Sequence, residues 1–313
     1  MLHMRVVSPE GSTDEVLSIL RAEPGATHVL ALRGVVVEPA GDLVEADVAR
    51  EAADEVIAAL CALGIDRAGG ITLEQLDTSL SDAADRAEEQ APGDAADAVV
   101  WQELLSRTGE ESRLNVTFLA FLAIACLLAA VGVITDSAVT IVGAMVVGPE
   151  FGPLAAIAVG LARRRWDLMR RGALAIAVGF PLAIGITAAG AALGSAVNLF
   201  EASVLRGPHA VDFVYQVGPW SFVVAVLAGA AGMLSMTSAK SAALVGVFIS
   251  VTTVPAAGYA GVAAILGQWD RVADSVGQLA VNMAGIVLAA ALVLLLRKGG
   301  WQVADPGRPL STG

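Results

Sequence analysis

The chain has 313 residues, a formal net charge of −12 and a mean hydropathy of +0.71, which is too apolar for an ordinary soluble protein. Residues 1–114 carry 8 Arg, no Lys and 23 Asp or Glu, whereas residues 115–313 carry 11 Lys or Arg and 8 Asp or Glu. The acidic first part argues against a nucleic-acid partner, and two cysteines are too few for a disulfide framework. The composition therefore predicts two domains, an acidic one in water and an apolar one in the membrane.

Residues 1–78 are expected to form a cytoplasmic α+β domain, because no apolar signal segment precedes them. Helices are predicted from about residue 13 and at about 50–63. The predicted strands are 2–7, 27–37, 42–48 and 71–76. The order β-α-β-β-α-β predicts a ferredoxin-like sandwich. Domains of this kind often bind regulators or hold oligomers together, so we expect a homo-oligomer.

The front domain shows no phosphate loop, nucleophile or metal-ligand spacing. His3 and His28 are expected to be strand residues rather than ligands. The sequence therefore predicts no catalytic residue, no metal and no cofactor.

Residues 79–114 are predicted to be an acidic linker followed by a juxtamembrane helix. The stretch 77–94 is rich in Asp, Glu and Ala and contains Pro92-Gly93, which is typical of a linker. From residue 95 to 113, apolar side chains among charges predict a helix near the membrane surface. Trp101 is either an interfacial anchor or packed on the front domain.

Residues 115–298 are predicted to be a transmembrane domain, followed by a cytoplasmic tail at 299–313. A spanning helix needs about 20 apolar residues. Six segments qualify: 115–134, 138–161, 172–194, 219–236, 241–266 and 276–296. Nine of the eleven Lys and Arg residues then fall on the side of the N-terminus, all but Arg206 and Arg271. This bias predicts a multi-pass protein of a bacterial inner membrane with both termini in the cytoplasm.

Two of the predicted spans are interrupted at corresponding places. The second contains Gly148–Pro153, with two Gly/Pro breaks around a carboxylate, and the fifth contains Ser250–Pro255. A shift of 103 residues places Trp166 on Trp269 and lays the first break over the second. With three spans in each half, the halves have opposite orientations. Broken helices paired in an inverted 3+3 repeat point to a transporter-type site in mid-membrane.

Glu150 is the strongest candidate for a functional residue. A carboxylate in mid-membrane costs about 2.5–3.5 kcal/mol, so it is normally paired, hydrated or functional. It would bind a cation or relay a proton. The alternative is a loop near the cytoplasmic surface that leaves Glu150 solvated.

Other candidates have simpler roles available. Asp136 is expected to cap the second span with its neighbours rather than to bind an ion. Three roles are considered for Lys240, in order of preference. Its side chain extends toward the membrane interface, it follows the positive-inside rule, or it attracts an anion. Asn282 is expected to form a hydrogen bond between helices, and the GxxxG spacing of Gly190 and Gly194 predicts close helix packing. The breaks and nearby hydroxyls complete the set of candidates for binding a solute or ion: Pro149, Gly152, Pro153, Thr252, Thr253 and Pro255.

One succession of short motifs resembles a known family. It consists of Asn115, Phe118-Leu119, Thr135-Asp136-Ser137, Gly143-Ala144-Met145, Pro149 and Gly152-Pro153. The pattern resembles the bacterial "uncharacterised hydrophobic domain" family over about residues 115–296. The family is labelled a domain of unknown function, so the resemblance implies a soluble region joined to a Gly/Ala-rich membrane domain but no activity. It also implies an apolar residue at position 150, so a mechanism shared by the whole family would not use Glu150.

Taken together, these patterns predict an α-helical polytopic membrane domain behind a ferredoxin-like domain. The favoured function is a transporter or channel-like protein for a small solute or ion, regulated or assembled by the front domain. The alternative is a membrane sensor or scaffold that transports nothing and whose front domain binds a metabolite or partner. No arrangement of residues favours an enzyme.

Overall fold

The computed structural model describes residues 1–76, 78–91, 98–201, 204–205, 218–237 and 253–302. These form two compact units. Met1–Leu104 make up the main part of the first unit, here called the front unit. Leu105–Met236 and the chain from residue 253 onward make up the second, here called the helical unit.

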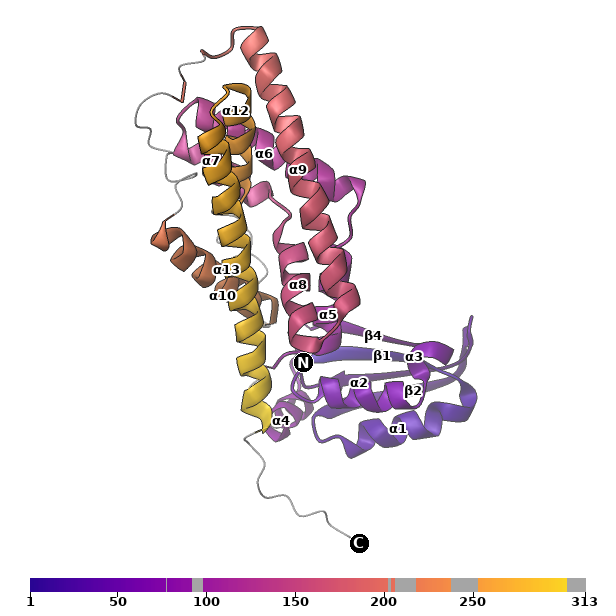
Figure 1. Ribbon diagram of the computed structural model, residues 1–313. Helices are drawn as coiled ribbons and strands as arrows, with labels where there is room; N and C mark the ends of the chain where they lie inside the picture. Colours follow the sequence, from indigo (N-terminus) through magenta and orange to yellow (C-terminus); the bar gives the residue numbers. More distant parts are fainter. Residues whose placement is uncertain (77, 92–97, 202–203, 206–217, 238–252, 303–313) are drawn as a thin grey trace. The chain divides into compact units, whose positions relative to one another are not determined.

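The front unit contains a four-stranded antiparallel sheet in the order β2-β3-β1-β4. Its strands are β1 (Leu2–Ser8), β2 (Ala26–Val37), β3 (Ala40–Val48) and β4 (Gly70–Gln75). Its helices are η1 (Glu10–Ser12), α1 (Thr13–Ala22), α2 (Ala53–Ala62) and the short α3 (Ile65–Ala68). Figure 1 shows α1 and α2 beside the sheet. Strands and the two main helices follow one another as the sequence predicts.

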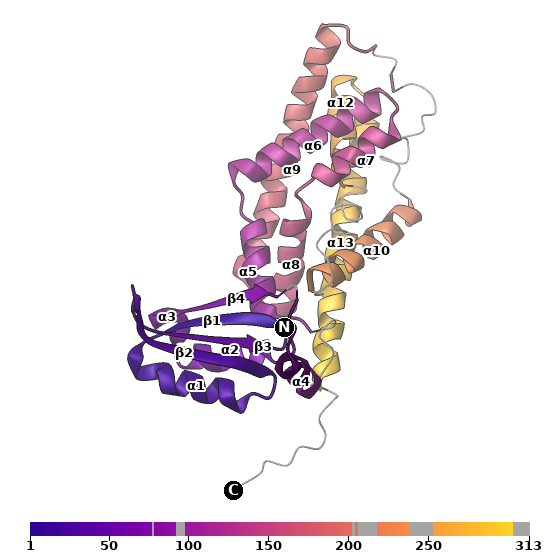
Figure 2. The same ribbon diagram turned by 180° about the vertical axis from the view of Figure 1, so that it is seen from behind.

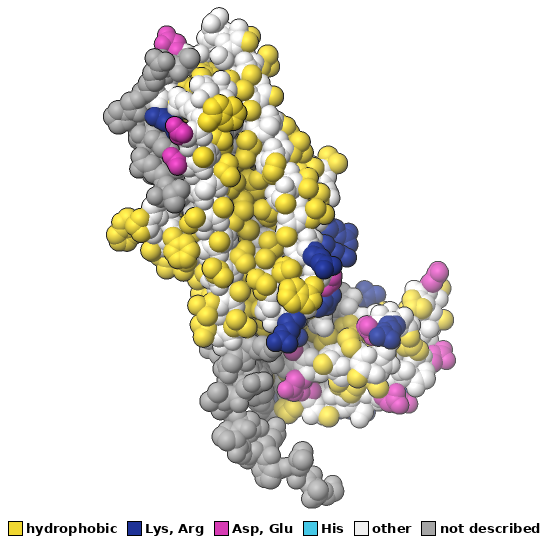
Figure 3. Space-filling model, viewed as in Figure 1, with side chains coloured by type: hydrophobic (Ala, Val, Ile, Leu, Met, Phe, Trp, Pro, Cys, Tyr) yellow, Lys and Arg dark blue, Asp and Glu magenta, His cyan; other side chains and the backbone are white. Residues whose placement is uncertain are grey.

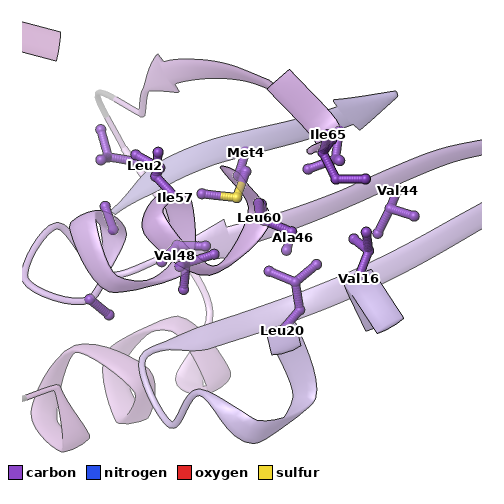
Figure 4. Close-up of a cluster of buried hydrophobic side chains, with 14 of the residues drawn as sticks. Leu2, Met4, Val16, Leu20, Val44, Ala46, Val48, Ile57, Leu60 and Ile65 are labelled. Carbon is purple, nitrogen blue, oxygen red and sulfur yellow. The ribbon is translucent and has the colours of Figure 1, made fainter. Parts of the chain in front are cut away.

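The core of the front unit lies between the sheet and these helices. Successive strand residues point to opposite faces, so Met4 and Val6 of β1 are fully buried, while Arg5 between them is exposed. Leu20 of α1 and Leu60 of α2 meet the same cluster (Figure 4). This cluster is apolar, while Asp42, Arg50 and Glu51 are buried outside it.

The front unit also contains two helices beyond β4. α4 (Asp82–Gln90) contacts β2, and it begins at Ser81, whose Oγ accepts hydrogen bonds from the backbone N–H groups of Ala83 and Ala84. The interpretation of residues 77–94 as a linker is therefore wrong for this stretch, because a side-chain cap and buried alanines stabilise a helix in spite of its polar composition.

α5 (Trp101–Glu111) begins in the front unit. Val100 lies in the apolar core, and the Trp101 N–H donates to Asp54 Oδ1 at 3.0 Å. Arg50 pairs with Glu103 at 3.1 Å. Trp101 thus belongs to the front unit and is bound to it through its backbone N–H group.

The helical unit contains seven described helices. They are α6 (Val116–Ile134), α7 (Ala138–Val147), α8 (Phe151–Arg163), α9 (Trp166–Ala196), α10 (Pro219–Thr237), α12 (Thr253–Ile265) and α13 (Trp269–Gln302). Four of them, α6, α9, α10 and α13, are long and apolar enough to cross a membrane, and α7 with α8 would form a fifth span bent by 55°. In the described residues, four or five candidate spans thus stand where six were predicted. The first half of the predicted fifth span, up to residue 252, lies outside the described residues.

α8 and α12, with 13 residues each, pack against the two longest helices. α8 and α12 each contact both α9 and α13, while α6 contacts α7, α9 and α12. In both views, α6 and α10 run obliquely to the long helices (Figures 1 and 2). Close packing relies on small residues: a Cβ atom on Gly258 of α12 would lie 2.8 Å from the carbonyl oxygen of Cys126 in α6.

The helical unit is apolar on the outside, as Figure 3 shows. Exposed residues of this kind include Phe121, Ile124, Leu174, Leu288 and Leu292. Inside, eight polar side chains of the described residues are fully buried: Thr108, Ser112, Glu150, Thr187, Thr253, Ser275, Gln278 and Asn282.

Candidate functional site

The candidate site is built on the interruption between α7 and α8. α7 ends at Val147, and Gly148 is extended with φ −64° and ψ 127°. A residue that precedes proline is disfavoured in the helical region, so Pro149 forces this extended conformation. α8 starts again at Phe151 after the 55° bend. The bend brings Glu150 into the interior.

Glu150 is fully buried at this bend. Its Oε1 accepts a hydrogen bond of 2.5 Å from Thr253 Oγ1, while its Oε2 has no hydrogen-bond partner. The alternative in which Glu150 sits in a solvated surface loop is therefore wrong. An oxygen left without a partner in an apolar interior is costly, so the site is chemically incomplete as it stands.

Thr253 is the first residue of α12, and it is fully buried like Glu150. Pro255 lies in the first turn of this helix, where the missing N–H group costs no hydrogen bond. α12 then runs without interruption to Ile265, so Pro255 does not kink the described helix. Thr252 and Lys240 lie outside the described residues.

A cavity of about 370 Å³ reaches Glu150 within the helical unit. Of the predicted candidates, Pro149, Glu150 and Gly152 line it. Its charged residues other than Glu150 come from the end of α5 and the segment after it: Arg107, Glu110, Glu111 and Arg113. The cavity thus connects a charged rim to a buried carboxylate.

Gly152 allows α5 to approach the break. A Cβ atom at Gly152 would lie 2.6 Å from the Cβ of Glu111, so any larger residue would displace the end of α5. Glu111 also pairs with Arg107 of the same helix at 3.1 Å. The second Gly/Pro pair of the motif therefore serves packing at the cavity wall, with Pro153 buried in the first turn of α8.

Asp136 and Asn282 do not line this cavity. Asp136 is exposed in the α6–α7 turn with φ +50°, and the N-cap of α7 is its neighbour Ser137, which accepts from the Thr140 N–H at 3.3 Å. Asn282 Oδ1 accepts from Gln278 Nε2 at 3.4 Å. That bond lies within α13, and the predicted bond between helices stays a prediction.

Sequence reasoning missed several polar residues of the interior. Thr187 Oγ1 and Gln278 Oε1 are buried without a hydrogen-bond partner. Ser275, Gln278 and Asn282 recur at a spacing of three and four, which places them on one face of α13. That spacing inside an apolar helix was a usable signal.

The histidines of the front unit are strand residues that share one carboxylate. His3 Nδ1 lies 2.8 Å from Asp47 Oδ1, and His28 Nδ1 lies 2.7 Å from Asp47 Oδ2. Burial by itself would raise the pKa of Asp47, but the hydrogen bonds and charge of His28 and His3 outweigh it and leave this pKa below its usual range. No group of three or more metal-ligating side chains occurs among the residues that the structure describes.

The apolar exterior and the four or five candidate spans among the described residues fit a helical membrane protein, in which the rare polar side chains face the interior. Comparison with protein families adds a match at residues 145–288 to a family described as "Domain of unknown function (DUF389)". The matched range contains the α7–α8 break and most of α13, while most of the predicted motif succession, up to Ala144, precedes it. No curated protein matches the chain. No solved structure matches it either.

Proposed function

We propose that the protein is a transporter or channel-like protein of a bacterial inner membrane that moves a small solute or ion through the helical unit. The observation that carries this proposal is the buried Glu150, with one oxygen bonded to Thr253 and the other without a partner, at the end of a cavity. A carboxylate with a free oxygen attracts a cation or accepts a proton. The class of solute that it favours is therefore a small cation.

The proposal includes an inverted 3+3 repeat. Both ends of α10 lie 103 residues after the ends of α6, and the first residues of α9 and α13 are Trp166 and Trp269, again 103 apart. Glu150 and Thr253 are also separated by 103 residues. The same offset at four places supports a repeat.

The packing supports the same symmetry. In a repeat of this kind α8 corresponds to α12, and α9 to α13. α8 contacts the α13 of the other half, and α12 contacts the α9 of the other half, so the contacts are reciprocal. In a structure with a pseudo-two-fold axis, a residue close to the axis contacts the equivalent residue of the other half. Glu150 and Thr253 are equivalent under the shift of 103 residues, and the hydrogen bond between them is a contact of this kind. The solute site would then lie on the axis, as in other inverted repeats.

Five exposed arginines support the orientation. Arg163, Arg164 and Arg165 occupy the α8–α9 turn, and Arg170 and Arg171 follow one turn later. With this turn in the cytoplasm, both termini are cytoplasmic and the cavity opens inward beside the start of α6.

The order β-α-β-β-α-β and the sheet order β2-β3-β1-β4 support a ferredoxin-like front domain. Its proposed role is to regulate or assemble a homo-oligomer, by analogy of fold. The described residues include no observation that specifically favours the sensor or scaffold alternative.

Flux measurements on the purified full chain in liposomes test the proposal, with H⁺, Na⁺ and K⁺ offered in turn. Glu150→Gln keeps the size of the side chain and removes its charge. Flux should therefore fall about ten-fold or more. A ten-fold fall corresponds to a loss of only about 1.4 kcal/mol of interaction between the carboxylate and the cation. Glu201→Gln is the matched control, because Glu201 is exposed and lies outside the cavity lining. Wild-type liposomes without flux of any offered ion, or equal flux in Glu150→Gln, would contradict it.

A further inference from the structure

The start of α9 carries a dense group of arginines beside the apolar surface of the helical unit (Figure 3). Five exposed arginines occur within nine residues: Arg163, Arg164, Arg165, Arg170 and Arg171. Arg165 pairs with Asp167 at 3.1 Å. No hydrogen bond or ion pair joins Arg170 or Arg171 to another residue that the structure describes. Two cations without a protein partner therefore remain available to an anion.

The length of α9 indicates the depth of these two arginines in a bilayer. Its 31 residues span about 46 Å, and the hydrocarbon core is about 30 Å thick. With the excess divided equally, about 8 Å, or five to six residues, lies outside the core at each end. Arg170 and Arg171 are the fifth and sixth residues of α9. Because helical side chains lean toward the N-terminus, both guanidinium groups reach the layer of lipid headgroups.

An apolar stripe continues from these arginines toward the middle of α9. Leu174, Val178 and Leu182 follow Arg170 at intervals of four residues, on the side of the helix that Arg170 and Arg171 share. The three side chains are 56 %, 40 % and 44 % exposed. From Arg171 to Leu182 the helix rises about 16 Å, close to the half-thickness of the hydrocarbon core. The stripe thus runs from the headgroup layer into the hydrocarbon, in the direction of a phospholipid acyl chain.

One acidic side chain lies on the same side of α9. Asp167 precedes Arg171 by one turn and by itself would repel an anion. Arg165 donates to both of its carboxylate oxygens, from Nε to Oδ1 and from Nη2 to Oδ2, at 3.1 Å each. The charge of Asp167 is therefore offset, and the positive charge of Arg170 and Arg171 prevails at this level.

The start of α13 provides an internal comparison. It also begins with Trp-Asp, and it is also a candidate span. Four and five residues after the tryptophan, however, α13 has Ala273 and Asp274, where α9 has its two arginines. The nearby Arg271 donates to the carbonyl oxygen of Leu205 and to the hydroxyl of Tyr259. The start of α13 thus lacks the cations that an anionic headgroup requires.

We propose that the start of α9 binds an anionic phospholipid of the bilayer. Arg170 and Arg171 hold its phosphodiester, and one acyl chain lies along Leu174, Val178 and Leu182. A guanidinium group donates two parallel hydrogen bonds to phosphate oxygens, which suits this contact. A soluble phosphate compound would use the arginines and leave the apolar stripe uncovered. The proposal does not depend on transport.

Photolabelling tests this site in the full chain reconstituted in nanodiscs. The probes are a phosphatidylglycerol and a phosphatidylcholine with the same diazirine-bearing acyl chain, each diluted into unlabelled phosphatidylcholine. Labelled peptic peptides are located by mass spectrometry. The peptide 172–182 should be labelled about thirty-fold more by the phosphatidylglycerol probe, because each basic side chain near the surface strengthens binding of anionic lipid about five-fold. The peptide 275–285 of α13 should be labelled equally by both probes.

Two double variants separate the charge from the shape of the site. Arg170→Gln with Arg171→Gln should abolish the preference for phosphatidylglycerol. Arg170→Lys with Arg171→Lys should keep most of it, since lysine retains the charge. The matched control is Arg21→Gln with Arg86→Gln, which removes the same charge from exposed arginines of the front unit and should label like the wild type.

Equal labelling of 172–182 by the two probes would overturn the proposal. An equal preference at 275–285 would also overturn it, since it would indicate only general enrichment of anionic lipid around the protein. The same holds if the lysine variant loses as much preference as the glutamine variant. Displacement of the probe by inorganic phosphate, but not by sodium chloride of equal ionic strength, would identify a site for a soluble anion instead.

Discussion

The front and helical units differ in the side chains that they expose. The front unit buries Met4, Leu20 and Leu60 in an apolar cluster and exposes most of its charged side chains. The helical unit exposes residues such as Ile124 and buries Glu150. The contrast follows the difference in composition between the two parts of the chain, since residues 115–313 are far poorer in charged residues than residues 1–114.

The contrast also changes what stabilises each unit. In water, burial of apolar surface is the dominant favourable term. Between lipid-facing helices that term is absent, so close contacts at small residues and buried polar bonds contribute more. Gly229 of α10, whose Cβ position would clash with the backbone of Ile286 in α13, illustrates such a contact.

The largest expected effect is in the apolar core of the front unit. Leu20→Ala should reduce the free energy of unfolding there by about 3 kcal/mol, since it leaves a cavity. In the full chain, hydrogen exchange of peptides from β1 and α2 should become about a hundred-fold faster. Leu80→Ala, at a side chain that is 96 % exposed, is the control and should leave exchange unchanged. Similar exchange in both variants would mean that this core does not hold the unit together.

The next effect compares one substitution in the two solvents. Ile124, at the centre of α6, and Leu30, in β2, are 49 % and 45 % exposed. Ile124→Arg should cost about 3 kcal/mol because it places a charge in mid-bilayer. Leu30→Arg should cost less than about 0.5 kcal/mol, as is usual at a surface in water. Folded protein recovered from membranes, measured by size-exclusion chromatography, should therefore fall only for Ile124→Arg. Equal recovery would abolish the contrast between the units.

The smallest effect concerns Asp47 and pH. Since its pKa is lower in the folded chain, the unfolded chain binds more protons in acid, and stability falls as pH drops below the ordinary carboxyl pKa of about 4. Asp47→Asn should cost about 1 kcal/mol at pH 7 and remove this acid dependence. Urea unfolding of the full chain, reported by reaction of the half-buried Cys61 with dithiodipyridine, measures both.

Glu89→Gln serves as the control for Asp47→Asn, because Glu89 is an exposed carboxylate of the same unit. It should keep the wild-type dependence on pH. An acid dependence that survives in Asp47→Asn would show that other carboxylates cause it.

Local patterns account for what could be predicted. Alternating residues identified β4, and apolar runs identified α6 and α10, because both signals come from residues close in the chain. α4 was not predicted because the polar composition of this stretch is typical of a linker. Ser81 as an N-cap, followed by several alanines, was nevertheless a local signal for a helix. Glu150 was recognised because a carboxylate is rare in an apolar run.

The sequence by itself determined which parts of the chain suit water or lipid, the order of strands and helices, and the Gly/Pro break at Glu150. Only the tertiary structure decided that Glu150 is buried against Thr253 and that the end of α5 lines the cavity. The physical reason is the distance along the chain over which each effect acts. Propensity and periodicity act over one or two turns, whereas these contacts join residues tens to a hundred positions apart, and their geometry depends on how whole helices pack.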